Sequence, residues 1–386
     1  MSAETRIFGG PVFDGIRLLQ DGSVVIRNGV IDEVTEGCPV PSAATLHDVN
    51  GRLIMPGLVD LHSDTLEKCI EMRPGVFFDA EFALLSLDQR IAACGITTFC
   101  HAISFADNEL GLRSFEQAEA LVRLIKRLGQ ENRFKVRHLV HMRHEIGADI
   151  GGFRTERMMD EGLVDVFSIM NHTPGQGQFK TLQSYVNFCE RNYNMNGENI
   201  YARLEKKKRQ QANGWNRVVD LAQKAKEIDI PVLSHDDDTK QKVTLVEQLG
   251  ATGCEFPITM DAVMAAKSKQ MNIFMGAPNM IRDCSSNGHL KASDTIVADA
   301  CDGLVSDYYP ECMIQAPFLA HRKQYAVLEQ ALGLVSSKPG KFLNEKNQRG
   351  RLVAGVPADL IVIDRAGEWK RVYQTWTSGK LVYQSP

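Results

Sequence analysis

The sequence lacks the features that would place the protein in a membrane, in the secretory pathway or on nucleic acid. No run approaches the ~20 apolar residues of a membrane span, and the first residues have neither the basic nor the apolar region of a signal peptide. Acidic residues outnumber basic ones, 48 to 44, so the formal net charge is −4 and no general basic surface exists. We expect a cytoplasmic protein with no nucleic acid or membrane partner.

Closely spaced cysteine pairs are also missing. The nine cysteines are odd in number, scattered along the chain and never spaced as CxxC. We therefore expect reduced thiols, because a disulfide framework or a structural zinc knuckle needs paired, regularly spaced cysteines. Long stretches rich in Pro, Gly or Ser are absent as well, and 44% hydrophobic with 24% charged residues is typical of an ordinary globular protein.

The two ends of the chain have the pattern of short strands joined by turns. Asn28 and Gly29 lie between two β-rich runs near the start, and Ser378 and Gly379 do so near the end. Such dipeptides are typical of β-hairpins. We expect residues 1–52 and 345–386 to build one small composite β-sandwich.

Between the two ends, residues 53–344 alternate short apolar runs with helical stretches, which is the pattern of parallel βα units. Eight apolar runs are present, at 57–62, 97–102, 135–140, 163–170, 230–235, 253–258, 272–277 and 303–307. A (β/α)8 TIM barrel takes ~250 residues, which leaves room for an accessory module. The expected fold class is therefore α/β, a (β/α)8 barrel with a β-sandwich built from both ends.

Polar residues at the ends of these strands are candidates for chemistry, because a TIM barrel places its active site there. His62 and Asp64 are two residues apart in an extended segment, so their side chains point the same way. Later strand ends add Glu145, His172, His235 and Asp307. Imidazole and carboxylate groups suit Zn, Mn or Fe, and six exceed the ligands of a single catalytic zinc. We predict two divalent metals held by these six residues and bridged by Glu145, with His141 and His144 as supporting groups.

Several motifs resemble those of the amidohydrolase superfamily. MPGLVDLHSD (55–64) is similar to its first-strand signature, and GVPADLIVID (355–364) to the stretch that closes its β-sandwich. The motifs at 60–76, 141–145, 170–179, 233–239, 276–282 and 304–318 resemble one branch more specifically, the α-D-ribose 1-methylphosphonate 5-triphosphate diphosphatases of phosphonate metabolism. The resemblance spans the whole chain, although the segment 283–288 departs from the serine-histidine-serine-glycine sequence usual in that branch.

The resemblance implies a metal-dependent hydrolase of a small phosphorylated substrate. Metal-bound hydroxide would attack a phosphorus of the ribose triphosphate and release pyrophosphate, and we predict that Asp307 is the general base as well as a ligand. Phosphoryl oxygens need cationic and polar partners. The predicted substrate-binding residues are Lys68, Arg73, Arg143, Asn279, Arg282 and Ser285, with Lys180 and Arg203 as further cationic candidates.

Two other functions are compatible with the same residues. The metal ligands would serve equally well for hydrolysis of a C–N bond, as in a cyclic amide, an acylated amine or a deamination substrate. A scaffold that kept the fold and lost the chemistry is the second alternative, from another functional class. For any of the three, we expect the chain to form a homo-oligomer.

Overall fold

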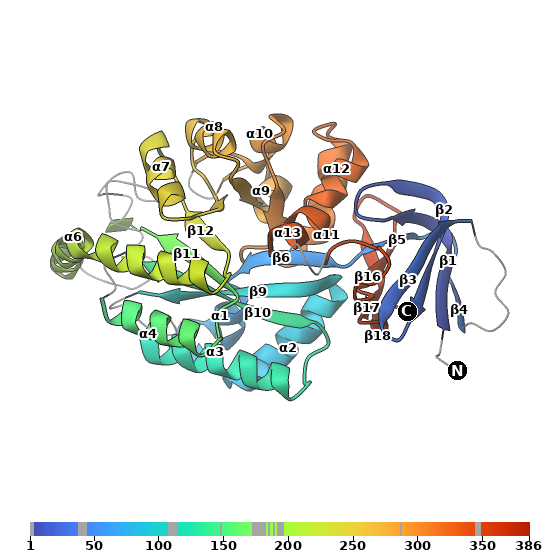
Figure 1. Cartoon of the computed structure of the whole chain (residues 1–386), viewed down its shortest axis with the longest axis horizontal. Helices are drawn as coiled ribbons and strands as arrows, with labels where there is room; N and C mark the ends of the chain where they lie inside the picture. Colours follow the sequence, from blue (N-terminus) through green and yellow to red (C-terminus); the bar gives the residue numbers. More distant parts are fainter. Residues whose placement is uncertain are drawn as a thin grey trace.

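A central parallel barrel and a separate sheet built from both chain ends make up the molecule (Figure 1). The computed structural model describes residues 4–37, 45–106, 114–146, 149–171, 183, 186–187, 190, 197–285, 288–343 and 349–386. Both parts were expected from the sequence, and the structure confirms the α/β class and the (β/α)8 barrel.

All eight predicted barrel strands are present, in sequence order around the barrel. They are β6 (Leu58–Ser63), β9 (Ile96–Phe105), β10 (Arg137–Glu145), β11 (Val166–Met170), β12 (Val232–His235), β13 (Gly253–Glu255), β14 (Asn272–Gly276) and β15 (Gly303–Val305). A parallel bridge between Ser63 and Asp307 brings the first strand to the last. There the backbone N–H of Asp307 donates to the carbonyl oxygen of His62 at 2.9 Å, which nearly closes the barrel.

The barrel interior is filled by side chains, so it is a core and not a channel. Its buried apolar residues come from seven of the eight strands and are Val59, Leu61, Cys100, Leu139, Val166, Leu233, Phe274 and Val305. Near-continuous apolar runs of this kind are typical of parallel strands that are covered on both faces. A filled interior leaves the strand ends as the place for a site.

Helices surround the barrel and follow most of its strands (Figure 1). They are α1 (Thr65–Ile70), α2 (Ala80–Ala93), α3 (Phe115–Gln130), α4 (Asp149–Asp160), α6 (Gly197–Glu227), α7 (Lys240–Gln248), α8 (Met260–Ser268), α9 (Ala277–Arg282), α10 (Ala292–Val297), α11 (Cys312–Arg322), α12 (Leu328–Gly333) and α13 (Ser337–Leu343). Thr239 and Thr259 cap α7 and α8, each accepting a backbone N–H three residues on at 3.2 Å. Among the described residues, none of these helices combines the length and the apolar character that a membrane crossing requires.

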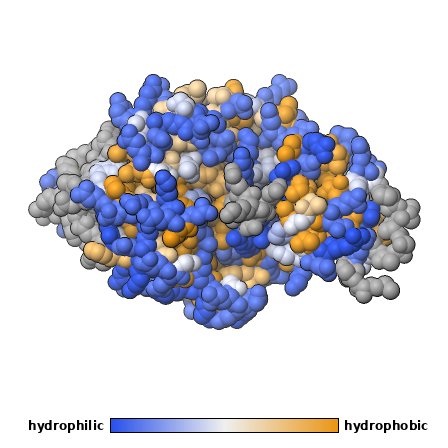
Figure 2. Space-filling view, viewed as in Figure 1, coloured by the Kyte–Doolittle hydropathy of each residue, from blue (hydrophilic) through white to orange (hydrophobic). Residues whose placement is uncertain are grey.

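The terminal sheet joins the two ends of the chain. Its strands are β1 (Glu4–Phe13), β2 (Leu18–Arg27), β3 (Val30–Glu36), β4 (Thr45–Asp48), β5 (Leu53–Pro56), β16 (Leu360–Asp364), β17 (Arg371–Thr377) and β18 (Lys380–Gln384). Antiparallel pairing of β5 with β16 connects the N-terminal strands to the C-terminal ones. The expected boundary between residues 52 and 53 falls just before β5, which belongs to this sheet. Apolar residues gather over this end of the molecule (Figure 2).

A short two-stranded hairpin follows α1 and has a largely apolar surface. It consists of β7 (Glu71–Arg73) and β8 (Val76–Phe77) and leads into α2. Its exposed apolar side chains, together with those at the start of α2, are Met72, Val76, Phe77, Phe78 and Phe82, which we call the apolar hairpin. The exposed fractions of these five side chains lie between 47% and 66%.

Candidate metal centre

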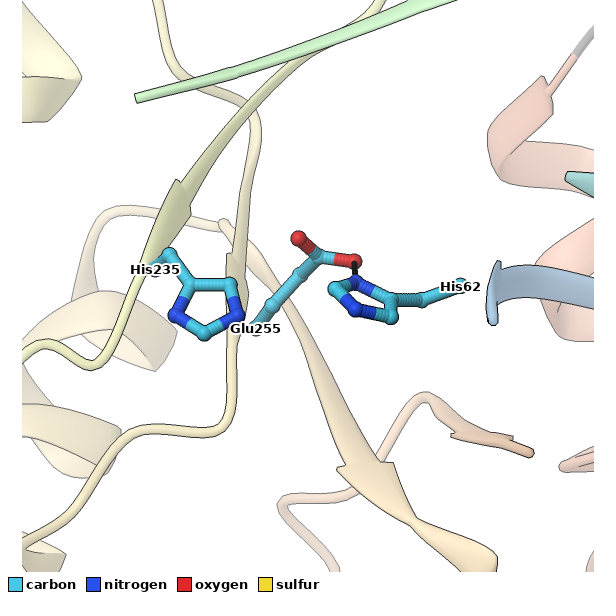
Figure 3. Close-up of side chains that lie close together, drawn as sticks. All are labelled: His62, His235 and Glu255. Carbon is cyan, nitrogen blue, oxygen red and sulfur yellow. Dashed lines mark hydrogen bonds and ion pairs between the residues drawn. The ribbon is translucent and has the colours of Figure 1, made fainter. Parts of the chain in front are cut away.

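Three buried side chains from three barrel strands converge at the carboxyl end of the barrel. His62 comes from β6, His235 from β12 and Glu255 from β13, and one ligand atom of each lies within 4.8 Å of the others. Figure 3 shows the Glu255 carboxylate between the two imidazole rings. Because parallel strands all end on the same side of the barrel, residues remote in sequence share this site.

The donor set and its burial suit a divalent metal ion. His62 Nδ1 lies 3.0 Å from Glu255 Oε1, whereas Glu255 Oε2 accepts no hydrogen bond from any residue in the described part of the chain. A buried carboxylate oxygen without a donor is costly, and a cation would offset that cost. Two histidines and a glutamate are a known ligand set of catalytic zinc, which leaves one position open. The residues therefore fit a divalent metal.

Burial disfavours the charged forms of side chains in this centre. It lowers the pKa of His62 well below the ordinary value, and the positive charge of Arg143 adds to that effect. Burial also lowers the pKa of His141, next to this group, to about 4, and raises the pKa of Glu255. Neutral imidazole rings are ready to bind a metal, because they need not release a proton first.

Glu255 is absent from the six predicted ligands, and its strand explains why. The expected strand covers 253–258 and places Glu255 in its middle, whereas β13 ends at Glu255. The backbone of Phe256 is left-handed, with φ of 51°, so the chain leaves the strand direction there. Inspecting the polar residue at each strand end would have found Glu255 if this end had been placed correctly.

Asp64 and Asp307 form an acidic pair at the seam between the first and last strands. The backbone N–H of Asp64 donates to the carbonyl oxygen of Asp307 at 2.7 Å. Burial and then the negative charge of Asp64 raise the pKa of Asp307 to about 7. A carboxylate with a pKa near neutrality can take up and hold a proton under working conditions, as a general base must.

The remaining predicted ligands have different places. Glu145 is buried at the end of β10, the third barrel strand, and is not one of the three converging side chains. His172 lies outside the described residues. The structure thus brings His62 and His235 within ligand distance and Asp64 beside Asp307, and the bridging role of Glu145 stays a prediction.

Arg143 lies within the centre and not at its edge. It is buried on β10, and its Nη2 lies 3.2 Å from Nε2 of His235. On the other side of that ring, His235 Nδ1 lies 3.1 Å from a carboxylate oxygen of Asp236. Arg143 therefore contacts a candidate ligand through Nε2 of that histidine, and its predicted contact with substrate stays a prediction.

Two of the predicted phosphate-binding cations meet at Tyr308, the residue after Asp307. Lys68 Nζ lies 4.6 Å from the centre of the Tyr308 ring, and Arg282 Nη1 donates to the Tyr308 hydroxyl oxygen at 3.3 Å. Lys68 and Arg282 are both exposed, on helices that follow β6 and β14. We call Lys68, Arg282 and Tyr308 the cationic rim.

The other predicted substrate-binding residues are spread along the chain. Arg73 is exposed at the end of β7, Asn279 is half-buried on α9, and Ser285 is half-buried shortly after α9. Lys180 lies outside the described residues, and for Arg203 the backbone alone is described. Their contacts with substrate remain predictions.

Comparison with known proteins gives one match over nearly the whole chain. The chain is 31% identical over 367 residues to the α-D-ribose 1-methylphosphonate 5-triphosphate diphosphatase of Escherichia coli strain K12. The aligned region covers 94% of this chain and 96% of that protein. A shorter stretch of 54 residues, 14% of each chain, is 35% identical to the imidazolonepropionase of Deinococcus radiodurans. No family model matches the sequence.

Solved structures share the fold at low sequence identity. An amidohydrolase superposes with a TM-score of 0.67 at 14% identity and covers all of both chains. The ochratoxinase of A. niger gives a TM-score of 0.67 at 14% identity, over 98% of this chain and 95% of that one. The dihydropyrimidinase of Brevibacillus agri gives 0.62 at 12%, over 99% and 95%. These similarities indicate the fold alone.

Proposed function

Because the chain belongs to the family of α-D-ribose 1-methylphosphonate 5-triphosphate diphosphatases, we propose that it releases pyrophosphate from that substrate or from a closely related ribose triphosphate phosphonate. It is a metal-dependent hydrolase with the amidohydrolase fold. The observation that carries the proposal is the 31% identity to the Escherichia coli enzyme over almost the full length of both proteins. The expected products are pyrophosphate and α-D-ribose 1-methylphosphonate 5-phosphate, or the corresponding 5-phosphate of the related substrate.

The proposal uses two divalent metals, drawn from Zn, Mn or Fe. When bound, such ions lower the pKa of a water molecule and polarise the phosphoryl group that it attacks. His62, His235 and Glu255 would hold one of them, as their spacing supports. The second would lie at Asp64 and Asp307, with Glu145 and His172 as further ligands.

Asp307 would take the proton from the attacking water. In the metal-free protein, burial and then Asp64 raise the pKa of the Asp307 carboxyl to about 7. Its backbone is left-handed, with φ of 57°, a conformation that aspartate tolerates better than most residues. Its backbone hydrogen bonds with His62 and Asp64 hold it at the seam of the barrel.

The cationic rim supports a polyphosphate substrate. Lys68 contacts the ring of Tyr308 and Arg282 contacts its hydroxyl, and Tyr308 is next in sequence to the proposed base. A triphosphate and its departing pyrophosphate carry several negative charges, which such cations stabilise through charge-assisted hydrogen bonds. A neutral cyclic amide would gain nothing from them, so the rim favours phosphate over a C–N substrate.

A direct assay tests the proposal. The purified chain, supplied separately with Mn²⁺ and Zn²⁺, is offered α-D-ribose 1-methylphosphonate 5-triphosphate and, in parallel, a panel of cyclic amides. We expect pyrophosphate release that Asp307→Asn abolishes. Hydrolysis of an amide without pyrophosphate release would overturn the proposal in favour of a C–N hydrolase, and turnover of neither class would favour the scaffold.

Self-association and a cytoplasmic location are part of the proposal. Three half-exposed phenylalanines of the apolar hairpin leave roughly 300 Å² of aromatic surface in water, and apolar patches of this size often serve an interaction. A second copy of the chain would cover this surface, since Glu71 and Arg73 on β7 give a two-fold pair opposite charges to match. The seven described cysteines are free thiols, which supports a reducing compartment.

A further inference from the structure

His141 is a buried imidazole beside the three converging ligands with no part in the proposed function so far. It lies on β10, two residues before Arg143, and is fully buried. Its ring is 5.2 Å from the ring of His62 and nearly perpendicular to it. Nε2 of His141 lies 3.6 Å from Oε2 of Glu255, on the side of the carboxylate away from its 3.0 Å contact with His62.

The hydrogen bonding of His141 fixes which nitrogen is free. Nδ1 lies 2.9 Å from the carbonyl oxygen of Leu61, and a carbonyl oxygen can only accept, so Nδ1 carries the hydrogen. In the neutral ring, Nε2 then presents a lone pair. A carbonyl that fixes the far nitrogen in this way is the usual partner of a metal-ligating histidine.

Nε2 of His141 faces Oε2 of Glu255. In the described part of the chain, neither His141 Nε2 nor Glu255 Oε2 has a hydrogen-bond partner. Their separation of 3.6 Å is too long for an N–H···O hydrogen bond. Two buried polar atoms that lie this close without a hydrogen bond are poorly compensated, and a cation bound by both would satisfy them.

We propose that His141 is the fourth protein ligand of the metal held by His62, His235 and Glu255. The inference rests on the metal-dependent function proposed above. The resulting set has three imidazole nitrogens and one carboxylate, enough to fill a tetrahedral zinc ion. His141 would then fill the position that the other three residues leave open, and the second ion, at Asp64 and Asp307, would be the one that activates water.

The test compares His141→Gln with His138→Gln, using zinc alone as the probe. His138 is a matched control, because it is also buried on β10 but bonds to Asp88 and His101 and not to the centre. Competition with a chromophoric chelator measures the affinity of the tightest zinc ion, after circular dichroism and thermal unfolding have shown that the metal-free variants are folded. We expect His141→Gln to weaken that affinity at least about tenfold and His138→Gln to leave it within about threefold.

A second measurement needs no variant. X-ray absorption fine structure of the wild-type protein with one equivalent of zinc counts imidazole ligands directly, and three per zinc are expected. Two imidazoles, or an unchanged zinc affinity in His141→Gln, would overturn the inference even if pyrophosphate is released. Conversely, zinc binding that depends on His141 without pyrophosphate release would leave the inference standing and reject the proposed function.

Discussion

A single carboxylate, Glu255, carries the negative charge between the imidazole rings of His62 and His235. Glu255→Gln keeps the size of this side chain and removes its charge, so we expect zinc affinity to fall at least about tenfold and pyrophosphate release about a hundredfold or more. Zinc per chain after gel filtration and initial rates measure the two effects. Glu247→Gln is the control, because that residue pairs with Lys269 away from the centre. Full zinc content in Glu255→Gln would contradict the assignment.

Asp307 is expected to make metal binding depend on pH. Its pKa of about 7, raised by burial and by Asp64, means that the metal-free protein holds a proton there at lower pH, which a metal must displace. Apparent metal affinity is therefore expected to rise with pH up to about 7, by as much as about tenfold per unit for one proton, and then to level off. Chelator competition at several pH values measures this. Asp307→Asn should remove the Asp307 contribution to the slope, and an equal slope in both proteins would exclude it.

The cationic rim separates a phosphate substrate from a neutral one. Reversing one charge, by Lys68→Glu or Arg282→Glu, is expected to lower kcat/KM for the triphosphate about tenfold to a hundredfold, as the loss of a charge-assisted contact would. Lys380→Glu on β18, in the terminal sheet, is a charge-matched control that should leave kcat/KM unchanged. If neither rim variant affects turnover of any substrate, the triphosphate assignment is wrong.

At the scale of the element, a chain of buried polar groups ties helix α2 to the outer face of the barrel. His101 Nε2 lies 2.7 Å from His138 Nδ1, and His138 Nε2 lies 3.0 Å from Asp88 Oδ1. Asp88 also accepts the backbone N–H groups of Lys135 and Val136, just before β10. These hydrogen bonds thus fix α2, β9 and β10 relative to one another, on the side of the strands away from the metal centre.

The hydrogen-bonded group of His101, His138 and Asp88 leads us to expect that the fold is less stable in acid. Burial and the charge of His138 lower the pKa of His101 well below its ordinary value. As pH falls below about 6.5, the unfolded chain takes up this proton before the folded one does. The stability that His101 contributes is therefore present above that pH and lost below it. We expect the difference in free energy of unfolding between wild type and His101→Gln, from urea titrations, to shrink as pH falls.

A matched variant makes that test specific. His321→Gln replaces an exposed histidine near the end of α11. The difference in free energy of unfolding between this variant and wild type should not shrink as pH falls. If the difference in free energy of unfolding between wild type and His101→Gln stays constant between neutral and acidic pH, the buried His101 side chain does not take part in acid unfolding.

The elements show how far the sequence alone leads. All eight barrel strands could be predicted, because a parallel strand covered on both faces needs an almost continuous apolar run. Their ends could not be placed as well: β10 continues to Glu145 beyond the expected end at 140, and β13 stops at Glu255 before the expected end at 258. Because the candidate site depends on the polar residue at each strand end, the misplaced end of β13 left Glu255 out of the predicted ligands. His62 and His235, which converge with it, were among those predicted.

Contacts between elements remote in sequence cannot be predicted from local sequence patterns. Lys68 and Arg282 could be named as cations, but their meeting at Tyr308 depends on how α1 and α9 leave their strands. The same holds for His141, whose role depends on a 3.6 Å approach to a residue on a strand three places away. Residue types and spacing indicate which groups are present, and tertiary packing decides which of them touch.

For the molecule as a whole, the apolar hairpin predicts the oligomeric state. We expect light scattering coupled to gel filtration to give a mass larger than one chain for wild type, and a shift toward one chain for the pair Phe77→Ser and Phe82→Ser, which removes two exposed aromatic rings. Val297→Ser, another exposed apolar residue on α10, is the control. A wild-type protein that runs as a single chain at all concentrations would contradict self-association.

The pairing of β5 with β16 also means that the terminal sheet can be completed only late in synthesis. The N-terminal strands leave the ribosome first, yet β5 meets β16 only after every barrel strand has been made. Until then one edge of β5 presents unpaired backbone groups, which invite pairing with other chains. All barrel strands are therefore synthesised while the N-terminal strands of the terminal sheet still lack their C-terminal partners. Slow elongation within residues 58–305 would prolong the interval in which nascent chains can aggregate.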